Sequence, residues 1–174
     1  AAGKNWLDLV HAMDLLGIHE DEAERLGITT YKVGQTWPLD MTGFKDWAEG
    51  LELIVVVEEK RKLIEVQVKE AIFDDRRGRR VYGYKDGHGD VLFQQHYSLD
   101  PTEIALKLGR ILTEEGRGTD RIAAGISRVE EARRANNAPE LANRMPYFCS
   151  GCPHNTSTKV PEGAVAGAGI GCHF

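Results

Sequence analysis

The strongest pattern in the chain is an unbroken apolar run, LIVVV, at residues 53–57. Such a run is typical of a parallel strand that is buried on both faces, so we expect residues 53–57 to form a central strand. β-branched and aromatic residues predict another strand over residues 28–33. Two shorter strands are expected at 79–85 and 91–93, on either side of the turn sequence DGHGD.

Apolar residues at helical spacing predict helices between and after these strands. Asn5 and Asp100 are the expected N-caps of two of them, and Pro101 suits the first helical position. The expected helices span about 5–16, 21–27, 44–51, 61–73, 100–115 and 120–135.

Helices that alternate with strands over residues 1–116 are the pattern of an open α/β sheet with right-handed crossovers. We therefore predict an α/β fold, with a mainly parallel open sheet in three layers, over residues 1–116. Residues 117–145 are predicted to be a helical linker, and residues 146–174 the start of a different domain.

Composition limits the classes of protein to which the chain could belong. The 174 residues carry a net charge of −5 and are 41% hydrophobic, which argues against nucleic-acid binding and for a packed core. No run approaches the roughly 18 apolar residues of a membrane span, and the sequence does not open with a charged segment followed by a short apolar one. Three cysteines cannot all pair, so we expect a reducing, cytoplasmic setting. The chain starts at Ala1 and stops at Phe174 directly after Gly-Cys-His, and we expect it to be a segment of a longer polypeptide.

All three cysteines lie close to the carboxyl end, at Cys149, Cys152 and Cys172. Thiolates at CxxC spacing select zinc or iron-sulfur clusters. A zinc site normally needs four ligands, and His154 or His173 could supply a nitrogen. In the plainer interpretation, the glycines before Cys172 mark a tight turn and that cysteine is a small buried hydrophobe.

A longer string around these cysteines, RMPYFCSGCPHNTSTKVPEGAVAGAGIGCH, resembles the start of the thiamine-diphosphate-binding domain of 2-oxoacid:ferredoxin oxidoreductases. The resemblance is to the long, fused indolepyruvate ferredoxin oxidoreductase family of bacteria. Upstream, GKNWLDLVHAMDLLGI, TYKVGQTWPLD and ELIVVVEEKRKLIEVQVKEAIFD resemble that family's domain of the transketolase C-terminal type. The resemblance covers nearly the whole chain.

The resemblance implies a cofactor set and site residues. Cys149, Cys152 and Cys172 would be three ligands of a [4Fe-4S] cluster, with a fourth cysteine from much later in the parent protein. Gly171, Cys172 and His173 would lie beside thiamine diphosphate, which is bound with Mg²⁺. The parent would oxidatively decarboxylate indolepyruvate or another 2-oxoacid, pass the acyl group to coenzyme A and the electrons to ferredoxin, and act as a homodimer.

The remaining expectations concern the activity of these 174 residues and the two glutamates after the central strand. The resemblance places the activating glutamate and the Mg²⁺-binding motif in other parts of the parent, so these 174 residues alone should be inert. Glu58 and Glu59, at the carboxyl end of the central strand, are expected to be structural. The alternative function is a non-catalytic α/β binding module with a small zinc site, formed by the three cysteines and a histidine.

Overall fold

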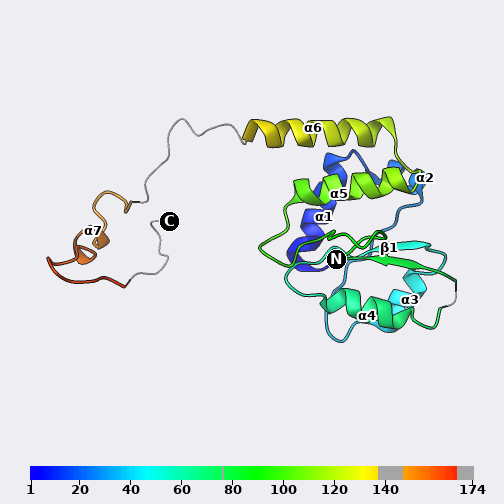
Figure 1. The fold of residues 1–174 in the computed structure, drawn as a ribbon, viewed down its shortest axis with the longest axis horizontal. Helices are drawn as coiled ribbons and strands as arrows, with labels where there is room; N and C mark the ends of the chain where they lie inside the picture. The colour runs from blue at the N-terminus through cyan, green and yellow to red at the C-terminus, as the bar shows by residue number, and fades with distance from the viewer. Residues whose placement is uncertain (76, 137–146, 168–174) are drawn as a thin grey trace. The chain divides into compact units, whose positions relative to one another are not determined.

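The computed structural model describes residues 1–75, 77–136 and 147–167. The chain divides into two units, Ala1–Asn136 and Asn137–Phe174. The elements of the first unit are α1 (Gly3–Leu15), α2 (Glu20–Leu26), α3 (Met41–Trp47), β1 (Leu53–Val55), α4 (Leu63–Ala71), β2 (Arg80–Tyr82), α5 (Pro101–Glu114) and α6 (Asp120–Asn136), as Figure 1 shows. In the described part of the second unit, the short helix α7 spans His154–Ser157.

β1 and β2 form a parallel two-stranded sheet in which Leu53 pairs with Arg80 and Val55 with Tyr82. Helices lie on both faces of this sheet, with α1, α5 and α6 on one side and α3 and α4 on the other (Figure 1). We call the first group the α5 layer and the second the α4 layer. The fold is therefore α/β, as predicted.

Side chains along β1 and its continuation alternate between two hydrophobic clusters. Leu53, Val55 and Val57 pack with residues of the α5 layer. Ile54 and Val56 pack with residues of the α4 layer. Because successive side chains of a strand point to opposite faces, this alternation confirms that the apolar run is buried on both faces.

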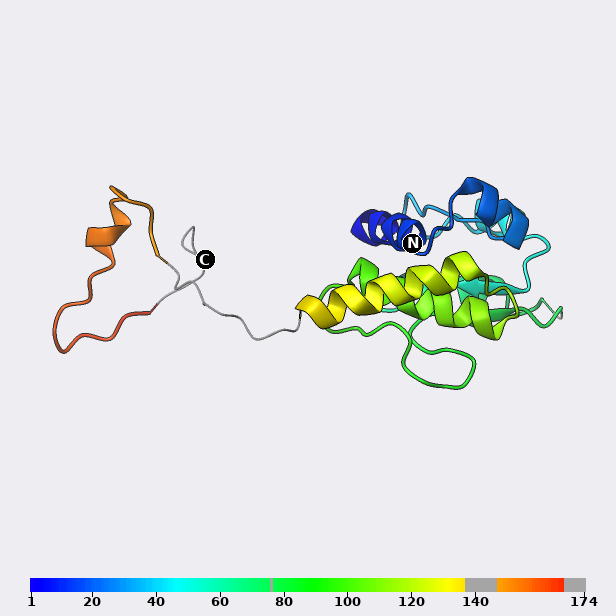
Figure 2. The same ribbon diagram turned by 90° about the horizontal axis from the view of Figure 1, so that it is seen from above.

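The α5 layer is held together by direct helix packing. α5 contacts both α1 and α6, and α6 also contacts α1. Seen from above, α6 lies along α5 (Figure 2). The segment predicted as a helical linker from residue 117 thus contributes α6, which packs against α1 and α5 within the first unit. No helix in the described ranges combines the length and the apolar character needed to cross a bilayer.

Several predicted boundaries are confirmed by local geometry. The Asp100 carboxylate accepts a hydrogen bond from the Thr102 amide at 2.8 Å, so Asp100 caps α5 and Pro101 occupies its first turn. Gly27 ends α2 in the left-handed conformation, with φ of 66°. A residue with a side chain is strained at such a φ, which explains a glycine there.

Other predictions were wrong. α1 begins at Gly3 after Ala2, so Asn5 lies inside the helix and is not its N-cap. Residues 28–33 form no strand, and within the described residues β1 has only β2 as a neighbour, which leaves β1 at an edge instead of the centre. A strand requires a ladder partner, and residues 28–33 are hydrogen-bonded to Ala1 instead of to β1.

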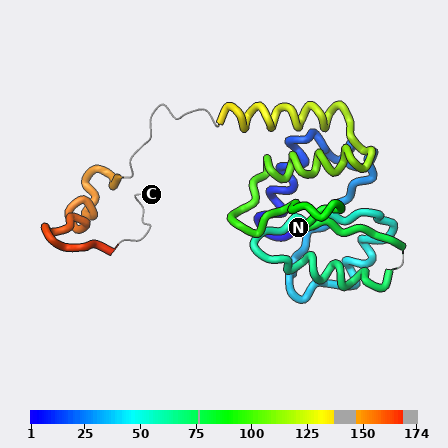
Figure 3. The backbone as a smooth tube through the Cα atoms, in the orientation of Figure 1, coloured from blue at the N-terminus to red at the C-terminus, as the bar shows by residue number. Residues whose placement is uncertain are grey.

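The connection from β2 to α5 is largely irregular (Figure 3). The strand expected at residues 91–93 is reduced to a single antiparallel bridge between Lys85 and Val91. Leu92 and Phe93 are nevertheless almost fully buried in the cluster of the α5 layer. Apolar burial holds this segment together with hydrogen bonds from the Leu92 and Phe93 amides to the Tyr84 and Gly83 carbonyls, at 2.8 and 3.3 Å.

Candidate functional site

The first two cysteines lie in one tight turn of the second unit. The Cys149 carbonyl accepts hydrogen bonds from the Cys152 amide and from the Asn155 side-chain nitrogen, both at 3.0 Å. Gly151 has φ of 79°, the left-handed conformation that the third residue of such a turn requires. The sequence CSGC therefore folds locally because glycine stands at this one position.

A histidine lies beside the second thiol. The Cys152 sulfur is 3.3 Å from His154 Nδ1, and the His154 ring stacks on Phe148 with ring centroids 5.2 Å apart. Cys149 is exposed and Cys152 half-buried, and both are free thiols. The turn thus presents two soft sulfur donors, with an imidazole nitrogen in contact with one of them.

The structure places only part of the predicted site. Cys149 and Cys152 lie in the same turn, and their role as metal ligands stays a prediction. Gly171, Cys172 and His173 lie outside the described residues, so their share in a metal or cofactor site stays a prediction. Across the described ranges, no three side chains of the His, Cys, Asp and Glu types gather as a metal site.

The two glutamates after β1 have structural roles, as expected. The Glu58 carboxylate accepts the amides of Ile64 at 2.8 Å and Glu65 at 3.2 Å, so it serves the first turn of α4. These amides have no partner within the helix. Burial raises the pKa of Glu58 above its ordinary value, and the hydrogen bonds from α4 oppose that shift. Glu59 accepts the Leu99 amide at 2.9 Å and ties the chain before α5 to the sheet.

Glu65 is a buried carboxylate that the sequence analysis missed. It accepts the Tyr84 amide at 2.7 Å and pairs with Lys69 at 2.5 Å. No sequence pattern indicates that Glu65 is buried, because only its tertiary contact with Tyr84 distinguishes it from a solvent-exposed helix residue. Its contacts join α4 to the end of β2, which is a structural task.

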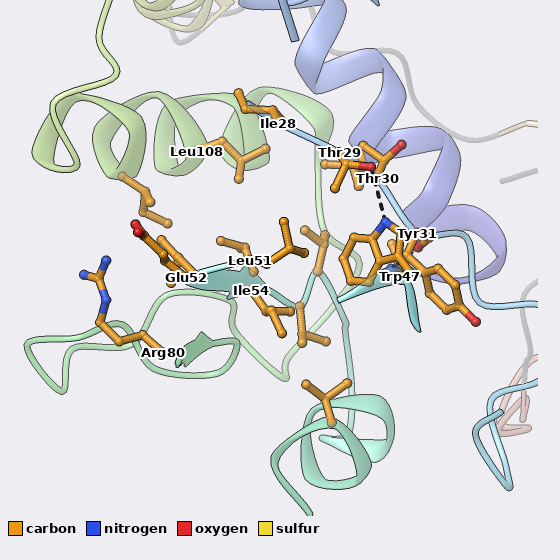
Figure 4. A pocket seen from close by; sticks show the side chains of 18 of the residues that line it. Ile28, Thr29, Thr30, Tyr31, Trp47, Leu51, Glu52, Ile54, Arg80 and Leu108 are labelled. Carbon is orange, nitrogen blue, oxygen red and sulfur yellow. Dashed lines mark hydrogen bonds between the residues drawn. The ribbon is translucent and has the colours of Figure 1, made fainter. Parts of the chain in front are cut away.

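A cleft of about 310 Å³ lies along the open edge of β1. Its walls are mostly apolar and include Ile28, Leu51, Ile54 and Leu108 (Figure 4). The Trp47 indole closes part of it and donates a hydrogen bond to the Thr29 hydroxyl at 3.3 Å. At one end, Arg80 forms a double hydrogen bond with Glu115, both contacts at 2.6 Å. No sequence pattern indicates this cleft, since its walls come from segments that are distant in the chain.

Comparison with known proteins assigns a family to the first unit. The family model of the indolepyruvate oxidoreductase domain matches residues 1–136. No solved structure matches the chain.

Two curated relatives carry the same activity in their names. Similar to this chain is the indolepyruvate oxidoreductase subunit IorA of Methanothermobacter marburgensis, which is 26% identical over 145 residues that cover 83% of this chain and 20% of the relative. The subunit IorA of Methanothermobacter thermautotrophicus is 25% identical over 136 residues, which cover 77% of this chain and 19% of the relative. The chain thus spans about a fifth of the length of these relatives. With the family model matching residues 1–136, this chain belongs to the indolepyruvate oxidoreductase domain family.

Proposed function

We propose that the chain is part of a 2-oxoacid:ferredoxin oxidoreductase of the long fused type, which acts on indolepyruvate or another arylpyruvate. In the proposed reaction the 2-oxoacid loses carbon dioxide, the acyl group passes to coenzyme A, and electrons pass to ferredoxin. The family match over residues 1–136 supports this proposal. The single structural observation that carries it is the turn that holds Cys149 and Cys152 together.

The donor set of this turn fits an iron-sulfur cluster in part. Iron-sulfur clusters are held by cysteine thiolates, and soft sulfur ligands disfavour harder metals such as Mg²⁺. Cys149 and Cys152 are free thiols that one turn brings together. They account for two ligands, and we propose Cys172 as the third.

Thiamine diphosphate, bound with Mg²⁺, supplies the carbanion chemistry of decarboxylation, and the cluster carries single electrons away. This chain's own residues have a positioning task. The Cys149 carbonyl, which accepts hydrogen bonds from the Cys152 amide and the Asn155 side chain, restrains the backbone of the turn that carries both cysteines. We propose that Gly171, Cys172 and His173 lie beside the thiamine cofactor, where glycine leaves room for a close approach of the backbone.

The first unit has a supporting role in this proposal. We propose that it is a three-layer domain of the transketolase C-terminal type, with a larger open sheet, that helps to form a cytoplasmic homodimer. Its helices on both faces of a parallel sheet support that architecture. The described carboxylates after β1 bind backbone amides of the same unit, which supports a structural role for this end of the sheet.

A second candidate is a zinc site in a non-catalytic module. It is favoured by the contact between the Cys152 sulfur and His154 Nδ1 at 3.3 Å, because zinc accepts mixed sulfur and nitrogen ligands. The two candidates differ in the metal, in colour and in redox activity.

The test uses the full-length parent enzyme, purified without oxygen. Cys152→Ser should abolish indolepyruvate-dependent reduction of ferredoxin and weaken the visible absorption of the clusters. Ser150→Ala, in the same turn but without a proposed ligand, should keep both and is the matched control. If Cys152→Ser keeps full activity and absorption, Cys152 is not a ligand. A colourless wild type that contains zinc would favour the second candidate.

A further inference from the structure

The cleft beside β1 has an unpaired strand edge as one wall. In a parallel ladder, the N–H and C=O groups of alternate residues face the same neighbour. Around β1 the groups that bond to β2 are those of Glu52, Ile54 and Val56. The amides and carbonyls of Leu53 and Val55 therefore face the cleft, and no described residue bonds to them. Unpaired backbone groups of this kind favour the addition of another strand.

The opposite wall, residues 28–33, has the side-chain arrangement of a strand without a partner. Ile28 packs into the cluster of the α5 layer. Tyr31 and Val33 belong to the cluster of the α4 layer. Ile28 thus faces the opposite layer from Tyr31 and Val33, as even and odd positions do along β1. To become a strand, residues 28–33 need a hydrogen-bonded neighbouring strand and no change in their own conformation.

Ala1 already bonds to this wall as the end of a parallel strand would. Its nitrogen donates to the Tyr31 carbonyl at 3.3 Å, and its carbonyl accepts the Val33 amide at 2.9 Å. In a parallel ladder, one residue bonds to the two residues that flank its partner on the neighbouring strand. Ala1 bonds in this way to Tyr31 and Val33, which flank residue 32. Ala1 also lines the cleft.

We propose that the cleft is the place of a further strand, parallel to β1, that lies between β1 and residues 28–33 and runs into Ala1. Its alternate residues bond to Leu53 and Val55 on one side and to Thr29 and Tyr31 on the other. The strand makes β1 an interior strand and residues 28–33 an outer one. All the segments then run in one direction, with the two helical layers on either face.

The lining of the cleft defines the chemistry of this strand. Side chains of the inserted strand point alternately into the apolar clusters of the two layers, so uncharged, β-branched residues fit best. A charged group fits poorly: burial lowers the pKa of the Ala1 amino group to about 6, against the opposing attraction of Glu58. A peptide N–H at the same place donates to the Tyr31 carbonyl without that cost. About four extended residues, at roughly 3.3 Å each, reach along β1.

The test adds a strand to the chain and measures its effect. One version of the protein carries Ile-Val-Ile-Val immediately before Ala1, and the control carries Gly-Ser-Gly-Ser. The apolar extension should raise the midpoint of thermal unfolding by about 5 °C or more relative to the control. It should also slow amide hydrogen exchange at Leu53 and Val55 by about tenfold or more, while Ile54, which bonds to β2, serves as the internal reference.

Two proline substitutions show where the extension binds. Thr29→Pro removes an amide that faces the cleft, because Thr29 shares the edge of Tyr31 and Val33, and it should abolish the gain from the apolar extension. Thr30→Pro removes an amide on the other edge and should leave the gain intact. Equal unfolding midpoints for the two extended proteins would overturn the proposal. So would full protection of Leu53 and Val55 in the unextended chain, since residues 28–33 would then pair with β1 directly.

Discussion

Gly125→Ala should destabilise the first unit, although alanine favours helices. A Cβ at Gly125 would lie 2.7 Å from the Leu15 carbonyl oxygen and 2.7 Å from Leu16 Cα, at the end of α1. Both are backbone atoms, so no rotamer change relieves the contact. Gly109 on α5 offers the matched control, because its Cβ would meet the Ile126 side chain at 2.7 Å and the Leu16 side chain at 3.3 Å.

The magnitude follows from two opposing effects. Replacing a helical glycine by alanine contributes about 1 kcal/mol through backbone entropy and propensity. Overpacking a well-packed contact costs about 1 to 3 kcal/mol. To reach ordinary contact, α6 must move from α1 by roughly 0.7 Å, which disturbs the buried Ile122 and Val129 on the same helix. We expect a net loss of about 1 to 2 kcal/mol for Gly125→Ala and a change within about 1 kcal/mol for Gly109→Ala.

Urea unfolding followed by circular dichroism measures both values. The Gly125 variant should show a lower midpoint with an unchanged slope, because only stability changes. If Gly125→Ala is at least as stable as the wild-type chain, α6 does not pack on the end of α1 as described. If both alanine variants lose the same stability, the difference between backbone and side-chain neighbours does not govern the effect.

The remaining predictions concern the core and two carboxylates. Phe44→Ala should cost about 3 to 5 kcal/mol in urea unfolding, because Phe44 is 2% exposed and packs against Tyr31 and Trp47; a loss below about 1 kcal/mol would contradict its burial. Asp100→Ala should cost about 1 kcal/mol near neutral pH and Asp100→Asn much less, since asparagine also caps helices. The Thr102 hydroxyl, as the main cause, lowers the pKa of Asp100, so the advantage of aspartate is present above its unfolded pKa and is lost as the pH falls below about 4; a cap effect that persists unchanged in acid would refute this. Burial raises the pKa of Glu58, so the folded state binds the proton more tightly, and wild-type stability should fall relative to Glu58→Gln as the pH rises from about 4 to about 7; a rise over that range would show that the hydrogen bonds from α4 outweigh burial.

Much of the fold follows from local signals. The unbroken run at residues 53–57 predicts burial on both faces, and the two clusters on either side of β1 confirm it. Asp100 with Pro101 predicts the start of α5, and Gly27 marks the end of α2. These signals succeed because capping and periodicity depend on residues close in sequence.

The failures concern partners distant in the chain. Residues 28–33 have strand composition and strand-like side-chain alternation, yet a strand also needs a neighbour, which composition does not supply. Asn5 is a residue type that often caps helices, but its side-chain amide bonds to Glu59 instead. In the orientation that satisfies both of its atoms, its nitrogen donates to the Glu59 carboxylate at 3.3 Å and its oxygen accepts from the Glu59 amide at 3.1 Å. Tertiary contact decides both cases.

The candidate site shows the same division. CxxC spacing predicts two cysteines close enough to share one metal, and the structure places Cys149 and Cys152 in one turn; metal binding there stays a prediction. The stacking of His154 on Phe148 has no comparable signal in the sequence. The cleft beside β1 was also not predictable, because its walls are brought together only by the packing of the two layers.

The most direct test of the proposed function is the metal and sulfide content of the full-length parent enzyme, prepared without oxygen. We predict iron and acid-labile sulfide, with a low-temperature EPR signal after reduction that decreases when Cys149 and Cys152 are both replaced by alanine. The Ser150→Ala variant should keep the signal. Stoichiometric zinc without sulfide, or an undiminished signal in the double variant, would contradict the assignment of this turn to an iron-sulfur cluster.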